Sequence, residues 1–263
     1  LVEDLLSPGR LVALKELHSN RGVDAIRQEF ALLAQLRHPN LAEVFDFDRC
    51  PATGLPRFTL EWVDGGDLVQ YARTAGRNLL PTVAAQALRA PAFLHDFGLI
   101  HRDLKPGNLL VSGSTVPRVS ILDFGLALHS RADTGGGPVG TLAYMAPEQL
   151  DGRTADKRSD LYSLGAVLWE AVVGTPPIDF GSHPDVASFV EAVRAGIQGP
   201  LEDVEGLPPG FNRWLLELLQ PHPEDRPSSA TEALARLNDR CQLSLPLETP
   251  GTRSARIDSG SPP

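Results

Sequence analysis

The sequence predicts an α+β protein with two lobes, a small lobe rich in strands followed by a larger lobe rich in helices. Strand-like segments gather in residues 1–66, and helical periodicity dominates from Leu68 onward. The chain has 263 residues, enough to bury a sizeable core, and no internal repeat is visible. Because ligands often bind where two such lobes meet, we expect the functional site between them.

Residues 1–66 form the expected small lobe. Apolar residues recur with the helical period up to residue 36, and Pro39 then disfavours a continued helix. The loop 50–56 separates two strand-like segments and indicates a hairpin. The expected elements are a strand at 10–17, a helix at 24–36, and strands at 41–48 and 57–63.

Residues 67–239 form the expected larger lobe. Its first long helix contains Pro91, which should kink or break it. Residues 248–263 lack apolar periodicity, and the tail, 240–263, is predicted to be a disordered linker. The expected elements are a helix at 81–98, strands at 109–113 and 119–123, and helices at 159–174, 185–196, 211–220 and 228–239.

Composition argues against several classes of function. The net charge of −9 disfavours bulk binding of nucleic acid or anionic membranes. The longest apolar segment, 161–174, is too short to span a bilayer and carries Glu170. Cys50 and Cys241 have no metal-ligand spacing and look like reduced thiols of a cytoplasmic protein. The chain starts at Leu1 and not at a methionine, so we expect a piece of a longer protein with further domains.

The segment LIHRDLKPGNLL, residues 99–110, places polar side chains at short offsets between two apolar runs. Asp103 can accept a proton from a hydroxyl group, and Lys105 can sit on a transferring phosphoryl group. Asn108 offers an oxygen to a hard cation such as Mg²⁺, and Asp123, straight after the second short strand, offers another. We therefore expect this loop to hold a metal-bound phosphate and to deprotonate an acceptor.

Four motifs follow one another along the chain: VALK at 12–15, HRDLKPGN at 101–108, DFG at 123–125 and APE at 146–148. In this order and spacing they resemble the eukaryotic-type, or Hanks-type, serine/threonine protein kinases over about residues 10–239. Only three of the 24 basic residues are lysines, a bias typical of a GC-rich, bacterial genome. The resemblance implies a bilobal protein-kinase-like fold that transfers the γ-phosphate of ATP to a protein hydroxyl group.

By this resemblance Asp103 is the catalytic base and Lys105 assists the γ-phosphate of ATP. Asn108 and Asp123 would hold Mg²⁺. Lys105 also favours serine/threonine over tyrosine specificity. His101 is expected to be a packed scaffold residue and not a catalyst.

In the small lobe, the resemblance implies that Lys15 binds the α- and β-phosphates of ATP and pairs with Glu29. Glu29 falls within the apolar stripe of the helix at 24–36, where an unpaired carboxylate would be costly. The segment LEWV, 60–63, resembles the part of the family that hydrogen-bonds adenine, here through Glu61 and Val63.

Further roles follow from the resemblance downstream of the DFG motif. Thr141 resembles the threonine that contacts the catalytic loop in serine/threonine kinases. Glu148 should pair with Arg226, and Asp160 should anchor the backbone of the catalytic loop. These last roles are structural.

The glycine-rich loop of the family is missing upstream of Lys15, because the 14 preceding residues contain one glycine, Gly9. We therefore expect a chain that begins inside the second strand of the small lobe, with weaker nucleotide binding and slower transfer than a chain that has the loop. Two alternatives remain: a pseudokinase or nucleotide-binding regulatory module of a larger signalling protein, and a small-molecule phosphotransferase of related fold. The intact set of motif residues argues against the first, and the segment through APE argues against the second.

Overall fold

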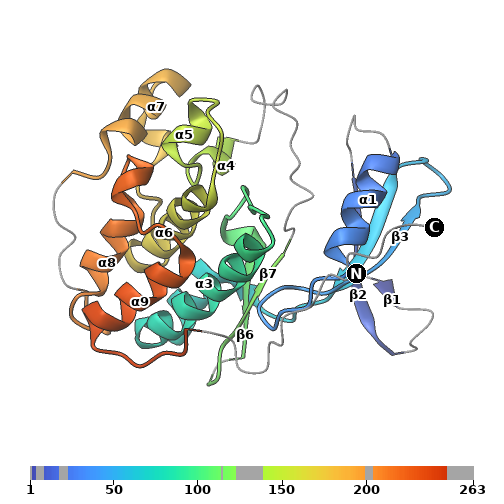
Figure 1. Cartoon of the computed structure of the whole chain (residues 1–263), viewed down its shortest axis with the longest axis horizontal. Helices are drawn as coiled ribbons and strands as arrows, with labels where there is room; N and C mark the ends of the chain where they lie inside the picture. Colours follow the sequence, from blue (N-terminus) through green and yellow to red (C-terminus); the bar gives the residue numbers. More distant parts are fainter. Residues whose placement is uncertain are drawn as a thin grey trace.

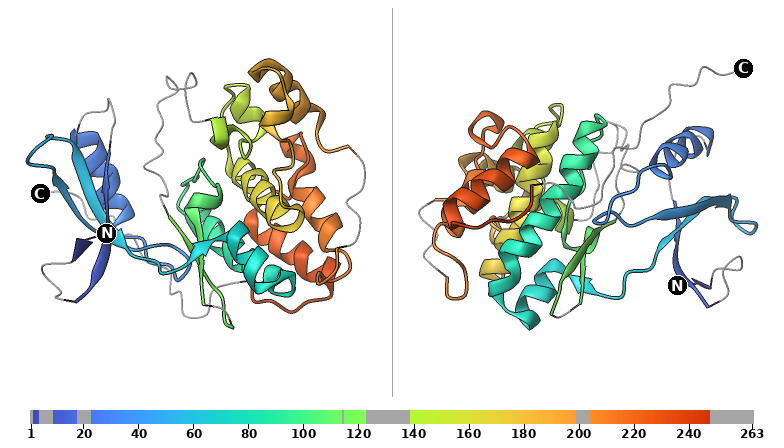
Figure 2. Two further views of the ribbon diagram at one scale, coloured as in Figure 1. Left: turned by 180° about the vertical axis from the view of Figure 1, so that it is seen from behind. Right: turned by 60° about the horizontal axis from the view of Figure 1, so that its bottom comes forward.

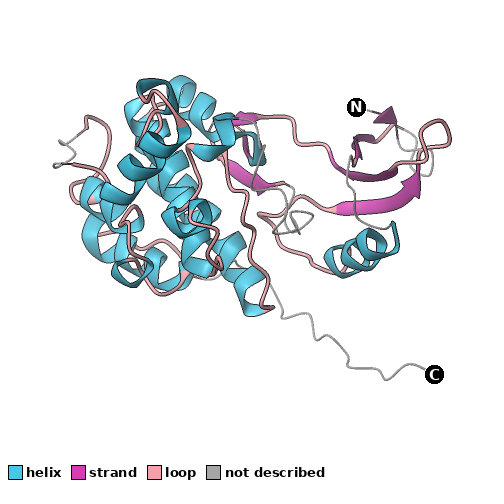
Figure 3. Ribbon diagram, turned by 90° about the horizontal axis from the view of Figure 1, so that it is seen from above, coloured by secondary structure: helices cyan, strands magenta, loops and turns pink. Residues whose placement is uncertain are grey.

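The chain folds into two lobes of unequal size, seen side by side in Figure 1. The structure is a computed structural model, and the residues it describes are 2–3, 9–17, 23–113, 115–122, 139–198 and 204–247. Figure 3 separates a strand-rich side from a side made mostly of helices. The predicted fold class, a small sheet lobe followed by a larger helical lobe, is confirmed.

The small lobe is an antiparallel sheet covered by one helix. Its strands are β1 (Val2–Glu3), β2 (Leu11–Glu16), β3 (Val44–Arg49) and β4 (Pro56–Glu61), in the order β1-β2-β4-β3, and its helix is α1 (Val23–Leu33). Phe30 of α1 joins the helix to the sheet, because its ring lies 5.4 Å from that of Phe47 and 6.3 Å from that of Phe58. The predicted strands and helix are confirmed, although α1 ends before residue 36.

The larger lobe begins after the segment that follows β4 and contains the rest of the described elements (Figure 2). They are β5 (Gly66–Asp67), α2 (Leu68–Ala75), η1 (Arg77–Leu79), α3 (Leu80–Asp96), η2 (Pro106–Asn108), β6 (Leu109–Ser112), β7 (Arg118–Ile121), α4 (Val139–Leu142), α5 (Pro147–Leu150), α6 (Lys157–Val173), η3 (Phe180–Ser182), α7 (Val186–Ala195), α8 (Phe211–Leu218), η4 (Pro223–Asp225) and α9 (Ala230–Cys241). The strands β5, β6 and β7 form a second, smaller antiparallel sheet.

Helix α6 is the centre of the larger lobe. It is buried along almost its whole length and packs against α2, α3, α8 and α9. Asp156 caps its first turn, and Gly174 ends it with φ +97°, a left-handed conformation that glycine adopts without steric cost. Among the described residues, no helix combines the length and the apolar composition that crossing a membrane requires.

Helix α3 continues through Pro91 as one element. The proline is buried in the helix interior, where it lacks the N–H that would bond to the preceding turn. The expected break is therefore absent. Packing of the apolar residues of α3 against α6 and α9 compensates for the missing hydrogen bond.

Two sets of polar contacts join the lobes next to the connecting segment. Asn40 donates its side-chain amide to the carbonyl oxygen of Val119 at 2.8 Å, and its own carbonyl accepts the N–H of Ile121 at 2.9 Å. The Arg118 guanidinium bonds to the Glu61 carboxylate at 2.7 Å. The hairpin of β6 and β7 is thus fixed against the small lobe.

The folded part of the chain extends beyond the expected boundary at residue 239. Helix α9 continues past that position. The side chain of Asn238 exchanges two hydrogen bonds with the backbone of Leu245, and Arg89 of α3 donates to the carbonyl oxygen of Pro246 at 2.9 Å. The prediction of disorder from residue 240 is therefore wrong up to residue 247, because specific side chains hold this segment; the remainder lies outside the described residues.

Candidate active site

One buried carboxylate, that of Asp160, anchors the backbone of the loop between α3 and β6. Asp160, in the first turn of α6, accepts the backbone N–H of His101 at 2.9 Å and that of Arg102 at 2.8 Å. His95 of α3 lies 2.8 Å from the same carboxylate through its Nε2 atom. Because Asp160 is fully buried, these donors are what compensates for its removal from water. The predicted role of Asp160 as an anchor is confirmed.

His101 is fully buried beneath this loop and belongs to its scaffold, as expected. Its Nδ1 atom accepts the backbone N–H of Asp103 at 3.3 Å. The proton of the neutral ring is therefore assigned to Nε2, which lies 2.9 Å from the carbonyl oxygen of Leu122 and donates to it. The ring thus ties the loop to the residue that precedes Asp123.

The loop brings three polar side chains into one hydrogen-bonded cluster, those of Asp103, Lys105 and Asn108. The ammonium group of Lys105 lies 2.8 and 3.1 Å from the two carboxylate oxygens of Asp103. The Asn108 amide donates to the Asp103 backbone carbonyl at 2.8 Å and to its carboxylate at 3.1 Å. Asn108 is buried, whereas the Asp103 side chain keeps 17% of its surface exposed. The carboxylate is therefore fixed in direction and still open to a reactant.

The oxygen donors of this cluster fit a hard cation. Because the Nδ2 atom of Asn108 is directed at Asp103, its Oδ1 atom remains available as a ligand. The N–H of Leu122 bonds to the Asn108 carbonyl at 2.9 Å. Asp123, the other expected ligand, lies outside the described residues. Within the described residues, no group of three or more His, Cys, Asp or Glu side chains forms a metal site.

The small-lobe candidates lie on β2, on α1, at the end of β4 and in the segment that follows β4. Lys15 lies in β2, paired with Phe58 of β4, and its side chain is half-buried. Glu29 lies in α1, but its side chain is not described, so the expected ion pair stays a prediction. Glu61 is the last residue of β4, and Val63 follows after Trp62; the Glu61 carboxylate contacts Arg118, and Val63 is buried.

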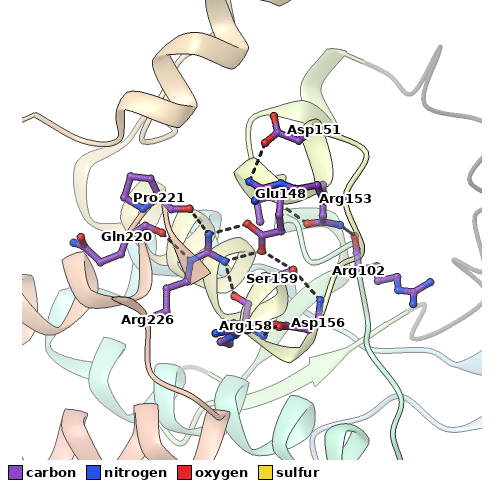
Figure 4. Close-up of polar contacts among 12 residues, drawn as sticks. Arg102, Glu148, Asp151, Arg153, Asp156, Arg158, Ser159, Gln220, Pro221 and Arg226 are labelled. Carbon is purple, nitrogen blue, oxygen red and sulfur yellow. Dashed lines mark hydrogen bonds and ion pairs between the residues drawn. The ribbon is translucent and has the colours of Figure 1, made fainter. Parts of the chain in front are cut away.

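The end of the APE motif is fixed by a buried ion pair, drawn in Figure 4. The Arg226 guanidinium donates to the two oxygens of the Glu148 carboxylate at 2.8 and 2.9 Å, and Ser159 donates to that carboxylate at 2.6 Å. Burial alone raises the pKa of Glu148, but the hydrogen bonds and charge of Arg226 outweigh it, so this pKa lies below its ordinary value. Arg226 also donates to the carbonyl oxygens of Arg158, Gln220 and Pro221. The predicted pair is confirmed.

One expected contact differs. Thr141 lies in α4, and among the hydrogen bonds between described residues the Asp103 carboxylate is bonded to Lys105 and Asn108 but not to Thr141. The expected contact of Thr141 with the catalytic loop is thus not a hydrogen bond to this carboxylate in the described part of the chain, and it stays a prediction.

Two side chains near the APE motif were not singled out from the sequence. The Tyr144 hydroxyl donates to the Glu170 carboxylate of α6 at 2.6 Å, and burial together with this acceptor raises the pKa of Tyr144. Gln149 donates its amide to the carbonyl oxygen of Arg102 at 3.1 Å. Neither residue belongs to the four motifs. Only their position beside APE could have indicated a role from the sequence.

Comparisons with known proteins agree with this geometry. The protein kinase domain family matches residues 6–237. The DNA damage-responsive serine/threonine-protein kinase RqkA of Deinococcus radiodurans is 38% identical over 244 residues, covering 87% of this chain and 35% of its own. The serine/threonine-protein kinase PknB of Mycobacterium tuberculosis is 36% identical over 245 residues, covering 87% of this chain and 38% of its own.

A solved structure matches as well. The crystal structure of Rad53 1–466 in complex with AMP-PNP superposes with a TM-score of 0.68 at 26% identity, covering 87% of this chain and 58% of that chain. The chain spans only a little over a third of the length of the two curated relatives. The family model matches nearly the whole chain, two relatives exceed 30% identity, and the fold is shared with the solved structure of Rad53. This chain therefore belongs to the protein kinase family.

Proposed function

We propose that this chain is the catalytic domain of a serine/threonine protein kinase, which transfers the γ-phosphate of ATP to a protein hydroxyl group. The observation that carries the proposal is the cluster in which Lys105 and Asn108 fix the Asp103 carboxylate while leaving it open to a reactant. The two curated relatives are named serine/threonine-protein kinases, which supports the same class of acceptor.

In the proposed mechanism, Asp103 orients the acceptor hydroxyl group and takes its proton. Lys105, already beside Asp103, neutralises charge on the transferring phosphoryl group. Asn108 and Asp123 would hold Mg²⁺, for which oxygen donors are the preferred ligands. Bound Mg²⁺–ATP supplies the phosphoryl group and the metal charge that stabilises its transfer. Asp160 keeps the loop backbone in place throughout.

The nucleotide itself is proposed to bind between the lobes. Lys15, paired with Glu29, would contact the α- and β-phosphates, and the backbone of Glu61 and Val63 would bond to adenine. The similar Rad53 structure is a complex with AMP-PNP, which supports a nucleotide of this class. The lobe boundary is proposed to lie at about residue 66, as expected from the sequence.

The proposal extends to the wider protein. Its partner would be a protein substrate carrying serine or threonine, its location the cytoplasm, and the parent protein would contain further domains. The lengths of the curated relatives, well beyond the matched part, support the last point.

The test is phosphoryl transfer from Mg²⁺–ATP, followed by mass spectrometry of the chain itself and of a generic protein substrate. Asp103→Asn should lower transfer about a hundredfold or more, because the base is lost, while ATP binding by calorimetry is unchanged. Asp48→Asn is the matched control, since Asp48 lies on β3 and contacts only Arg57 among the described side chains. Equal transfer by the Asp103→Asn variant and the wild type would refute the assigned base.

The alternatives give other results. ATP binding without transfer in the wild type would favour a pseudokinase or regulatory module. Transfer to a small molecule but never to protein would favour a small-molecule phosphotransferase.

A further inference from the structure

Arg102, the residue before the proposed base, has a strained backbone. Its φ is +67°, and among the described residues only one other non-glycine residue, Gln242, has a positive φ. A side chain in this left-handed region costs free energy, so it persists only where surrounding contacts hold it. The conformation of Arg102 sets the direction in which the chain continues into Asp103. Whatever holds Arg102 therefore also orients the base.

The peptide groups of Arg102 are held from two sides. Asp160 accepts its N–H at 2.8 Å from the side of α6. The side-chain amide of Gln149 donates to its carbonyl oxygen at 3.1 Å from the side of α5. The first contact belongs to the anchor already described, whereas the second comes from a residue outside the kinase motifs.

Gln149 makes a second contact that fixes its orientation. Its Oε1 atom accepts the backbone N–H of Ala146 at 3.1 Å. One neighbour can only donate and the other, the carbonyl of Arg102, can only accept, so the amide oxygen and nitrogen can be assigned without ambiguity. Ala146 has no polar side chain of its own to cap α5, and Gln149 supplies the capping contact at the third helical position.

The amide of Gln149 therefore bridges two segments. On one side lies the end of the APE motif, fixed by the neighbouring residue Glu148 through Arg226. On the other side lies the backbone of the catalytic loop. The contact with Ala146 is local to α5, whereas the bond to Arg102 forms only when the two segments are correctly placed relative to each other.

We propose that Gln149 is a positioning residue for phosphoryl transfer: its amide holds the Arg102 backbone in its left-handed conformation and so directs Asp103 at the acceptor. This inference rests on the proposed kinase function. It assigns to Gln149 no contact with substrate or nucleotide. Its effect belongs in the rate of transfer and not in the binding of ATP.

If Gln149 had only a structural role, it would act through its contact with Ala146 alone. Two variants separate this contact from the contact with Arg102. Gln149→Glu keeps an oxygen that accepts the Ala146 N–H, but it cannot donate to the Arg102 carbonyl. Gln149→Met has similar length, removes both contacts and adds no charge. If the contact with Arg102 positions the base, both variants should slow transfer; if only the start of α5 matters, only Gln149→Met should.

The experiment measures kcat, the KM for ATP and the KM for protein substrate in the wild type and both variants. We expect kcat to fall about tenfold in both, with the KM for ATP changed less than about twofold, as for a misoriented base. Gln35→Glu is the matched control, because the exposed Gln35 amide also donates to a backbone carbonyl, that of Ala31, in the other lobe. A wild-type kcat in Gln149→Glu would overturn the proposal.

A second measurement does not depend on activity. Amide hydrogen exchange of a peptide covering residues 99–105 should become faster in both variants than in the wild type, because one of the two restraints on Arg102 is lost. Unchanged exchange would overturn the positioning role even if the wild type had no kinase activity. An inactive wild type with faster exchange in both variants would instead refute the proposed function and retain the restraint.

Discussion

The Glu148 carboxylate and the Arg226 guanidinium, 78 residues apart in sequence, are joined by two hydrogen bonds of 2.8 and 2.9 Å. Both side chains are almost wholly buried, at 5% and 0% exposure. A charge left alone in such a place is far more costly than the intact pair. The pair therefore makes the end of the APE motif depend on the loop that precedes α9.

Replacing Arg226 by methionine should destabilise the fold by about 3–5 kcal/mol, because Glu148 would remain buried without its cation. The measurement is urea unfolding followed by circular dichroism. Arg194→Met is the control: Arg194 also forms an ion pair, with Asp151, but its side chain is 45% exposed, so its loss should matter far less. Similar losses in the two variants would contradict this account of the buried pair.

The same pair predicts a dependence on pH. The pKa of Glu148 is lowered in the folded state below its ordinary value of 4.5. Its ionisation therefore stabilises the fold fully above about pH 4.5, and this stabilisation is lost as the pH falls through the folded-state pKa. The stability difference between the wild type and Glu148→Gln should thus be largest near neutral pH and shrink in acid. Urea unfolding of both proteins between about pH 7 and pH 3 checks this, and a constant difference would be inconsistent with it.

Much of this architecture was predictable because it depends on local patterns. The stripe that includes Phe30 and Leu33 predicted α1, and the alternating segments predicted β2 to β4, since both rest on the period of apolar residues. The roles of Glu148 and Asp160 followed from motifs whose spacing is shared across a family.

Other features could not be predicted because they depend on contacts between distant segments. Nothing local indicates that Asn238 would hold Leu245, so the end of the folded region was placed too early. Pro91 suggested a break, but tertiary packing kept α3 whole. The bridge made by Gln149 depends on the distance between α5 and the catalytic loop, which no periodicity in the sequence reports.

Lys105 should be required for the rate of transfer and not for the fold. Its ammonium group contacts both oxygens of Asp103, and its side chain is 32% exposed. Without Lys105, the Asp103 carboxylate keeps the hydrogen bond from Asn108 and its contact with water. Lys105→Met should therefore lower kcat about a hundredfold, because the positive charge that neutralises the transferring phosphoryl group is lost. The unfolding midpoint should be nearly unchanged.

The matched control for this variant is Lys157→Met, because Lys157 is an exposed lysine in the first turn of α6. Transfer from Mg²⁺–ATP and thermal unfolding are measured on the same preparations, with Lys105→Arg as a third protein that keeps the charge. We expect Lys105→Arg to recover part of the lost rate, since a guanidinium can also neutralise phosphate but differs in shape and reach. If Lys105→Met and Lys157→Met transferred phosphate equally fast, Lys105 would be no more than a surface partner of Asp103.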